Sequence, residues 1–72
     1  MNTDIVDVSV DKLPIGVSYI TAITEIARSW CRENVIANGL DFGPSVEIEN
    51  RFVPDISAEM RNFGLVVLER VW

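Results

Sequence analysis

The stretch Leu65-Val66-Val67-Leu68-Glu69-Arg70-Val71-Trp72 decides the fold of this chain, because it can be interpreted as a strand or as part of a helix. It is rich in β-branched and other apolar residues and follows the breaker Gly64, which favours a strand. A helix that begins near Ser57 instead forms one apolar stripe, made of Met60, Phe63, Gly64, Val67, Leu68 and Val71. That helix carries glycine in its interior, at a cost of about 1 kcal/mol relative to alanine. We therefore predict the strand and keep the helix as the alternative.

Two further strands are predicted upstream from alternation of apolar and polar residues. Valine occupies every second position from Val6 to Val10 in the segment that begins at Ile5, which is typical of a half-buried strand. The following Leu13-Pro14-Ile15-Gly16 interrupts the pattern, since proline cannot donate to a ladder and glycine favours turns. After a loop over residues 40–45, apolar and charged residues alternate over residues 46–52, which predicts another strand that ends at Pro54.

A long helix is predicted between these strands, over residues 19–37. Ser18 is a suitable N-cap, and Asn38-Gly39 is a suitable C-terminal stop. Between them apolar residues recur every three or four positions, namely Tyr19, Ala22, Ile23, Ile26, Ala27 and Trp30.

These elements predict an α+β fold of order β-α-β-β, in which one long helix covers one face of a small three-stranded sheet. Because a helix connects the first two strands, we expect them to be parallel, with the C-terminal strand antiparallel between them. The alternative order is β-α-β-α, with a C-terminal helix. Residues 1–72 are too few for more than one core, so we expect a single domain.

One helix covers only one face of such a sheet, and the other face is a candidate dimer surface. It would carry Ile5 with either Leu65, Val67 and Val71 or Val66, Leu68 and Trp72. We predict a partner interface at Leu65, Val67, Val71, Trp72 and the loop residue Phe42. Trp72 is included because a large aromatic residue at the last position suggests burial against another surface.

Composition restricts the partners and the means of stabilisation. The net charge of −5 argues against direct binding to nucleic acid or to an anionic membrane, and favours protein partners, especially basic ones. The single cysteine excludes an internal disulfide, and the absence of histidine removes the usual zinc ligands, so we expect no metal and no cofactor. Small domains are usually stabilised by disulfides, a metal or a partner chain, and only the partner chain remains here, so we predict a homo-oligomer.

Candidate chemistry is sparse, and we expect a protein that is not an enzyme. Cys31 has no histidine to act as its base, and is interpreted as a small helix residue at the edge of the core. Glu47 and Glu49 share one strand face but are assigned to solvent. Arg28 and Arg32, one helical turn apart, could contact an anion or an acidic partner, although a solvated helix face is the favoured interpretation.

Three segments resemble the DinI-like proteins, small acidic modulators of the RecA filament: Val6 to Lys12, Leu13 to Gly16 and Glu25 to Arg28. Ser57, Glu59, Arg61, Val67-Leu68 and Trp72 are similar to the second helix of that family. The resemblance implies a C-terminal helix and a role at the recombinase filament. The acidic ridge of the family's second helix is reduced here to Glu59 and Glu69, so the DNA-mimic function that it implies loses its main support.

The leading hypothesis is therefore a small acidic protein-binding regulator or inhibitor, of the kind found among phage and mobile-element accessory proteins. One alternative is a DinI-like modulator or DNA mimic that competes for a basic nucleic-acid-binding site. Another is an accessory subunit of an enzyme complex. The N-terminus lacks the basic region of a signal peptide and no apolar run is long enough to span a membrane, so we expect a cytoplasmic protein.

Overall fold

The computed structural model describes residues 5–35, 40–42 and 45–72, with the backbone alone for residues 40–42. In chain order the elements are β1 (Val8–Lys12), β2 (Val17–Ala22), α1 (Glu25–Asn34), β3 (Leu40–Phe42), β4 (Ser45–Glu49), the 3-10 helix η2 (Asn50–Phe52), α2 (Val53–Phe63) and β5 (Val67–Val71). This arrangement confirms the predicted α+β class. Its sheet topology and several element boundaries differ from the prediction.

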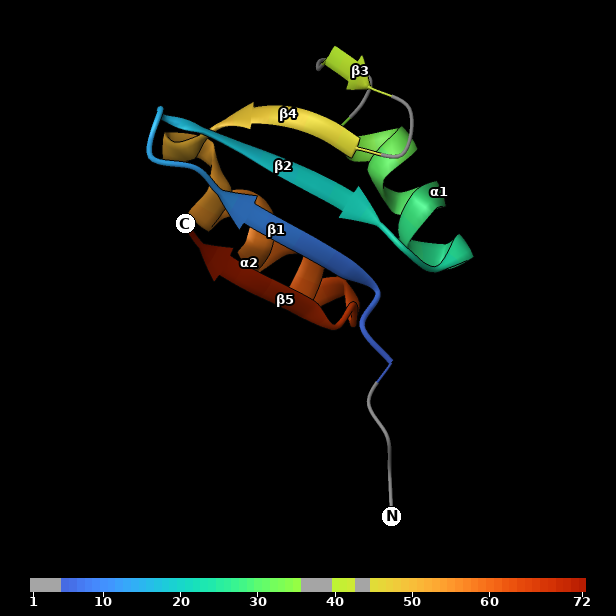
Figure 1. The fold of residues 1–72 in the computed structure, drawn as a ribbon. Helices are drawn as coiled ribbons and strands as arrows, with labels where there is room; N and C mark the ends of the chain where they lie inside the picture. The colour runs from blue at the N-terminus through green and yellow to red at the C-terminus, as the bar shows by residue number, and fades with distance from the viewer. Residues whose placement is uncertain (1–4, 36–39, 43–44) are drawn as a thin grey trace.

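The sheet is mixed and larger than predicted. Its strand order is β3-β4-β2-β1-β5, with β1, β2, β4 and β3 paired antiparallel and β5 added parallel to β1. Figure 1 shows α1 and α2 behind the sheet, so both helices cover the same face.

Two antiparallel steps separate β1 from β4, so these strands run in the same direction, but the antiparallel strand between them is β2. The prediction that the C-terminal strand lies there was wrong, because β5 forms the sheet edge beside β1.

The predicted helix over residues 19–37 was wrong in its first part. Residues Val17–Ala22 form β2, with Ser18 and Ile20 buried, and the helix begins only at Glu25. Thr24 caps this helix, because its side chain accepts a hydrogen bond from the Ala27 N–H at 3.3 Å. Ser18, the predicted cap, instead donates to Asn50 Oδ1 from inside the sheet. Pairing with β1 and β4 therefore outweighs the helical spacing in this segment.

The C-terminal third contains both of the elements that were weighed against each other. Helix α2 ends at Phe63, and Gly64 follows in the left-handed conformation with φ 107°. The Gly64 N–H donates to the Arg61 carbonyl and the Leu65 N–H to the Met60 carbonyl, each at 3.0 Å, which is the Schellman pattern. The chain then continues as β5, so residues 53–72 are a helix followed by a strand.

Two other boundaries also shift. The first strand spans Val8–Lys12 where residues 5–10 were predicted. The strand predicted over residues 46–52 ends at Glu49, and Asn50–Phe52 forms a 3-10 turn. Pro54 then occupies the first turn of α2, where its missing N–H is tolerated, so the prediction that it ends the strand was wrong.

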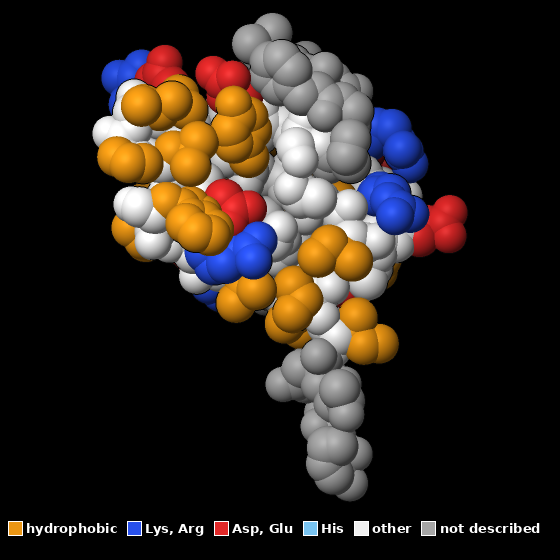
Figure 2. Space-filling view, in the orientation of Figure 1, with side chains coloured by type: hydrophobic (Ala, Val, Ile, Leu, Met, Phe, Trp, Pro, Cys, Tyr) orange, Lys and Arg blue, Asp and Glu red, His pale blue; other side chains and the backbone are white. Residues whose placement is uncertain are grey.

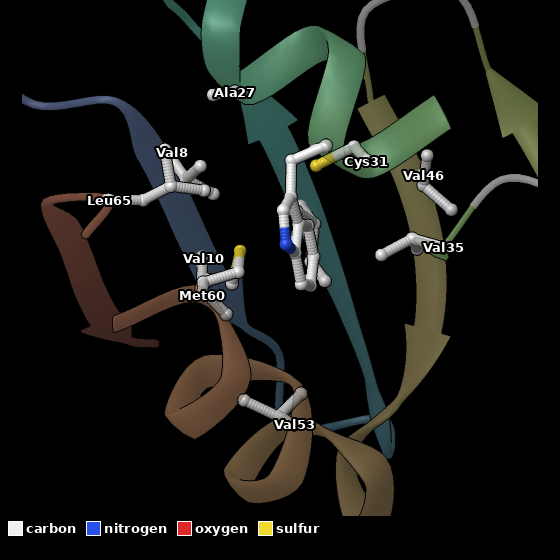
Figure 3. Close-up of a cluster of buried hydrophobic side chains, with 11 residues drawn as sticks. Val8, Val10, Ala27, Cys31, Val35, Val46, Val53, Met60 and Leu65 are labelled. Atoms are coloured by element: carbon white, nitrogen blue, oxygen red, sulfur yellow. The ribbon is translucent and has the colours of Figure 1, made fainter. Parts of the chain in front are cut away.

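The core lies between the sheet and the two helices. Val8 and Val10 of β1 meet Met60 of α2 and Leu65, while α1 contributes Ala27 and Cys31, as Figure 3 shows. The full set of buried apolar residues is Val8, Val10, Ile20, Ala27, Trp30, Cys31, Val35, Val46, Val53, Met60 and Leu65. All strand members of this set point to the helix-covered face. The opposite face of the sheet is therefore composed of different residues.

Candidate functional site

The candidate site is the sheet face that contacts neither α1 nor α2, which we call the free face. Residues directly opposite each other in a sheet share a face, so the register of three strand pairings, β1–β2, β1–β5 and β2–β4, identifies its members. They are Ser9, Asp11, Val17, Tyr19, Thr21, Ser45, Glu47, Glu49, Leu68 and Arg70, joined by Trp72 directly after β5. The Trp72 N–H donates to the Lys12 carbonyl at 2.9 Å, which continues the β1–β5 ladder by one step.

Asp11 is the centre of a polar cluster on this face. Its carboxylate accepts two hydrogen bonds from Arg70, at 2.8 Å from Nε and 3.3 Å from Nη2, and one from Trp72 Nε1 at 3.1 Å. Desolvation raises the pKa of Asp11, but the hydrogen bonds from Trp72 and Arg70 and the charge of Arg70 outweigh it and leave the pKa below its ordinary value. The Arg70 guanidinium also lies 6.0 Å from the centroid of the Trp72 ring. The cluster thus holds the exposed Trp72 indole beside the Arg70 guanidinium.

Apolar side chains surround this cluster. Leu68 is 43% exposed and Trp72 is 66% exposed on one side of β1, while Val17 and Tyr19 of β2 are half-buried on its other side. Figure 2, which views the molecule from the side of the free face, shows hydrophobic side chains in several groups interrupted by acidic and basic ones. The free face thus combines exposed aromatic and aliphatic residues with an ion pair.

The structure separates the predicted interface residues. Leu65 is buried in the core at 5% exposure, so the prediction that it contacts a partner was wrong. The reason is the left-handed Gly64, which turns Leu65 beneath α2. Val67 is half-buried and packs against the core from the covered face. Val71 is 78% exposed at the sheet edge, and the side chain of Phe42 lies outside the described part of the molecule.

The other predicted contact, Arg28 with Arg32, lies on α1 away from the free face. Both side chains are exposed, and Arg32 Nη2 donates to Ser29 Oγ at 3.4 Å. No acidic partner or convergent polar group joins them within the described residues. They form a solvated helix face, which is the interpretation that the sequence favoured.

Asp7 has a structural role that its place in the sequence does not indicate. Its carboxylate accepts from Thr24 Oγ1 at 2.7 Å and from the Val66 N–H at 2.8 Å, and thus joins the start of α1 to the start of β5. These bonds, the one from Val66 first, lower the pKa of Asp7. Asn50 has a similar role, since its side-chain nitrogen donates to the Leu13 carbonyl at 3.2 Å. Only the fold brings such distant partners together.

The remaining candidate residues are Cys31, Glu47 and Glu49. Cys31 is buried, and burial raises the pKa of its thiol, which makes it a weaker nucleophile. Glu47 and Glu49 lie on the free face, and Glu49 pairs with Arg51 at 2.7 Å. Across the described ranges, no three His, Cys, Asp or Glu side chains are close enough to hold a metal ion. Within the same ranges, no helix has the length and apolar character needed to cross a membrane.

Comparison with known proteins does not extend these observations: no family model, no curated protein and no solved structure matches the chain. The resemblance to DinI-like proteins therefore stays a prediction.

Proposed function

We propose that this chain is a small, non-catalytic regulator or inhibitor that acts by binding a larger basic protein through its free face. It acts in the cytoplasm as a homo-oligomer. The observation that carries the proposal is the exposed apolar surface around Asp11 and Arg70, with Leu68 and Trp72 as its most accessible members. Aromatic, arginine and aliphatic anchors of this kind dominate the binding energy of many protein interfaces.

Charge supports a basic partner. The chain carries eleven acidic and six basic residues, and Glu47 and Glu49 add carboxylates along the β4 side of the free face. Arg70 is already neutralised by Asp11, so it does not reverse this acidic character. A complementary basic surface would accelerate association and select against acidic competitors.

The proposal is tested by affinity capture from the source cells, followed by mass spectrometry, with three versions of the chain. Leu68→Asp places a charge in the exposed apolar part of the free face, where it does not disturb the core. Ile15→Asp is the matched control, because Ile15 is an aliphatic residue with 77% exposure in the β1–β2 turn.

We expect one basic protein to be retained by the wild type and by Ile15→Asp, and to be lost with Leu68→Asp. Retention should fall steeply between low and high salt, because screening weakens exposed charge contacts. Equal retention by all three chains would contradict a role for the free face. A salt-insensitive or acidic partner would contradict the charge argument.

A further inference from the structure

The outer edge of β5 is an open hydrogen-bonding edge. The Trp72 N–H donates to Lys12, and the Val66 carbonyl accepts from Asp7 and Val8, so the even-numbered residues of this segment direct their backbone groups toward β1. Backbone groups alternate in direction along a strand. The N–H and C=O groups of Val67, Glu69 and Val71 therefore point away from β1, where no described strand pairs with them.

This edge lacks the features that usually prevent pairing. Natural edge strands are protected by proline, bulges or charged side chains that resist a second strand. The two charges of β5 are both occupied within the molecule: Glu69 binds Arg61 at 3.1 Å and Lys12 at 4.0 Å, and Arg70 binds Asp11 at 2.8 Å. The edge is thus regular over Val67–Val71, without a proline or a break in its register to β1, and its charges are paired within the molecule.

We propose that β5 pairs antiparallel with β5 of a second copy of this chain, about a twofold axis at Glu69. This proposal rests on the homo-oligomer of the proposed function and names its strand and register. Placing the axis at Glu69 pairs all residues of Val67–Val71, so that residue 67 lies opposite residue 71 and residue 68 opposite residue 70. The outward groups of Val67, Glu69 and Val71 then bond across the axis.

The apolar side chains at the two ends of the strand complement one another in this register. On the covered side, Val71 with its 78% exposure lies opposite the half-buried Val67 of the second copy. On the free side, the ladder continues to place Trp72 opposite Val66, which are 66% and 39% exposed. Val71 and Trp72 at the end of each strand thus cover Val67 and Val66 at the beginning of the strand in the second copy. Each Glu69 meets its symmetry copy with its own Arg61 alongside.

The axis is perpendicular to the sheet, which has a consequence for the free face. Both free faces lie on the same side of one continuous sheet. The two clusters of Asp11, Arg70 and Trp72 adjoin the new β5–β5 boundary, because β1 is the neighbour of β5. A dimer therefore presents a doubled surface to a partner, which increases avidity when the partner offers two sites.

The edge is tested first by Val71→Pro. Proline removes an outward N–H and obstructs the second strand, while the bonds between β5 and β1 involve the even-numbered residues and are kept. Val71→Ala is the matched control, because it keeps the N–H. Loss of two symmetry-related hydrogen bonds predicts a dimer dissociation constant raised roughly 30-fold or more for Val71→Pro. Sedimentation equilibrium measures this constant, and far-UV circular dichroism checks the fold.

The register is tested by disulfide formation under mild oxidation. Cα atoms of a hydrogen-bonded antiparallel pair are about 5.5 Å apart, within the range of a disulfide. Glu69→Cys should therefore cross-link two copies. Val71→Cys should not, since its symmetry copy lies four residues along the strand, about 13 Å away. The native Cys31 is buried and does not compete.

The proposal is supported if the wild type and Val71→Ala are dimeric, if Val71→Pro dimerises more weakly, and if a disulfide forms at residue 69 but not at residue 71. A monomeric wild type, a Val71→Pro chain as dimeric as wild type, or a cross-link at residue 71 alone would overturn it. These outcomes differ from failure of the proposed function. If Val71→Pro is monomeric but still captures the basic partner through Leu68, the dimer stands and only the avidity argument fails.

Discussion

The two faces of the sheet use the same strands for different purposes. On the covered face, Val8, Val10 and Ile20 are at most 1% exposed and lie beneath α1 and α2. On the free face, the same strands carry Asp11 and Tyr19, beside Leu68 and Trp72 on the neighbouring segment. One β-hairpin thus supports the core on one side and an exposed apolar surface on the other. Stability and interaction should therefore respond to different substitutions.

Leu65 and Leu68 give the largest test of this contrast, because they are identical residues three positions apart. Leu65 is 5% exposed and Leu68 is 43% exposed. We expect Leu65→Ala to lower the free energy of unfolding by about 2–4 kcal/mol, through lost transfer energy and a cavity. Leu68→Ala should lower it by less than about 1 kcal/mol. Urea denaturation at low protein concentration measures both, and similar losses for the two variants would contradict the separation of the faces.

Gly64 gives a second test of the contrast between Leu65 and Leu68, because the turn at this residue directs Leu65 into the core and Leu68 to the free face. With φ at 107°, the backbone is in a region that side chains with a Cβ atom rarely adopt. We expect Gly64→Ala to destabilise the fold by about 1–2 kcal/mol. Gly64→Asn should cost less, because asparagine tolerates the left-handed region. Thermal unfolding should rank glycine above asparagine above alanine, and any other order would count against this role.

Asp11 lies within β1 on the free face, whereas Asp7 directly precedes β1 and joins the start of α1 to the start of β5. Its folded pKa is lowered by hydrogen bonds from Val66 and Thr24, so its stabilising contribution is present above the ordinary pKa of 3.8. That contribution is lost as the pH falls through the lower, folded pKa. Stability measured from pH 6 toward pH 2 should thus fall less steeply in Asp7→Asn, with Glu33→Gln on the exposed face of α1 as the control. Parallel curves for Asp7→Asn and the wild type would contradict the linkage.

The smallest effect is expected at Arg70, whose pairing with Asp11 lies on the exposed surface. Arg70→Gln should change the free energy of unfolding by less than about 1 kcal/mol, because exposed ion pairs contribute little. The same change should alter the environment of Trp72, which lies 6.0 Å from the guanidinium. Acrylamide quenching of tryptophan fluorescence reports this, with the buried Trp30 as a constant background. A large loss of stability would show that the free face belongs to the core.

The predictions from sequence succeeded where one periodicity was unopposed. Alternation at Val8 and Val10 identified a strand, and the spacing of Ala27 and Trp30 identified the second half of a helix. They failed over Val17–Ala22, where Tyr19 and Ala22 fit a helical stripe while Ser18 and Ile20 fit an alternating strand. Strand partners on both sides decided that conflict, and those partners are distant in sequence.

By itself, the sequence determined the α+β class, the acidic surface and a strand at its C-terminal end. The tertiary structure alone decided which side of that strand is exposed. Side chains alternate with a period of two, so the single turn at Gly64 determines that Leu65 is buried and that Leu68 and Trp72 remain on the free face. The local sequence pattern likewise could not predict the position of β5 at the sheet edge. That position depends on pairing between Val8–Lys12 and Val67–Val71, which are separated by almost the whole chain.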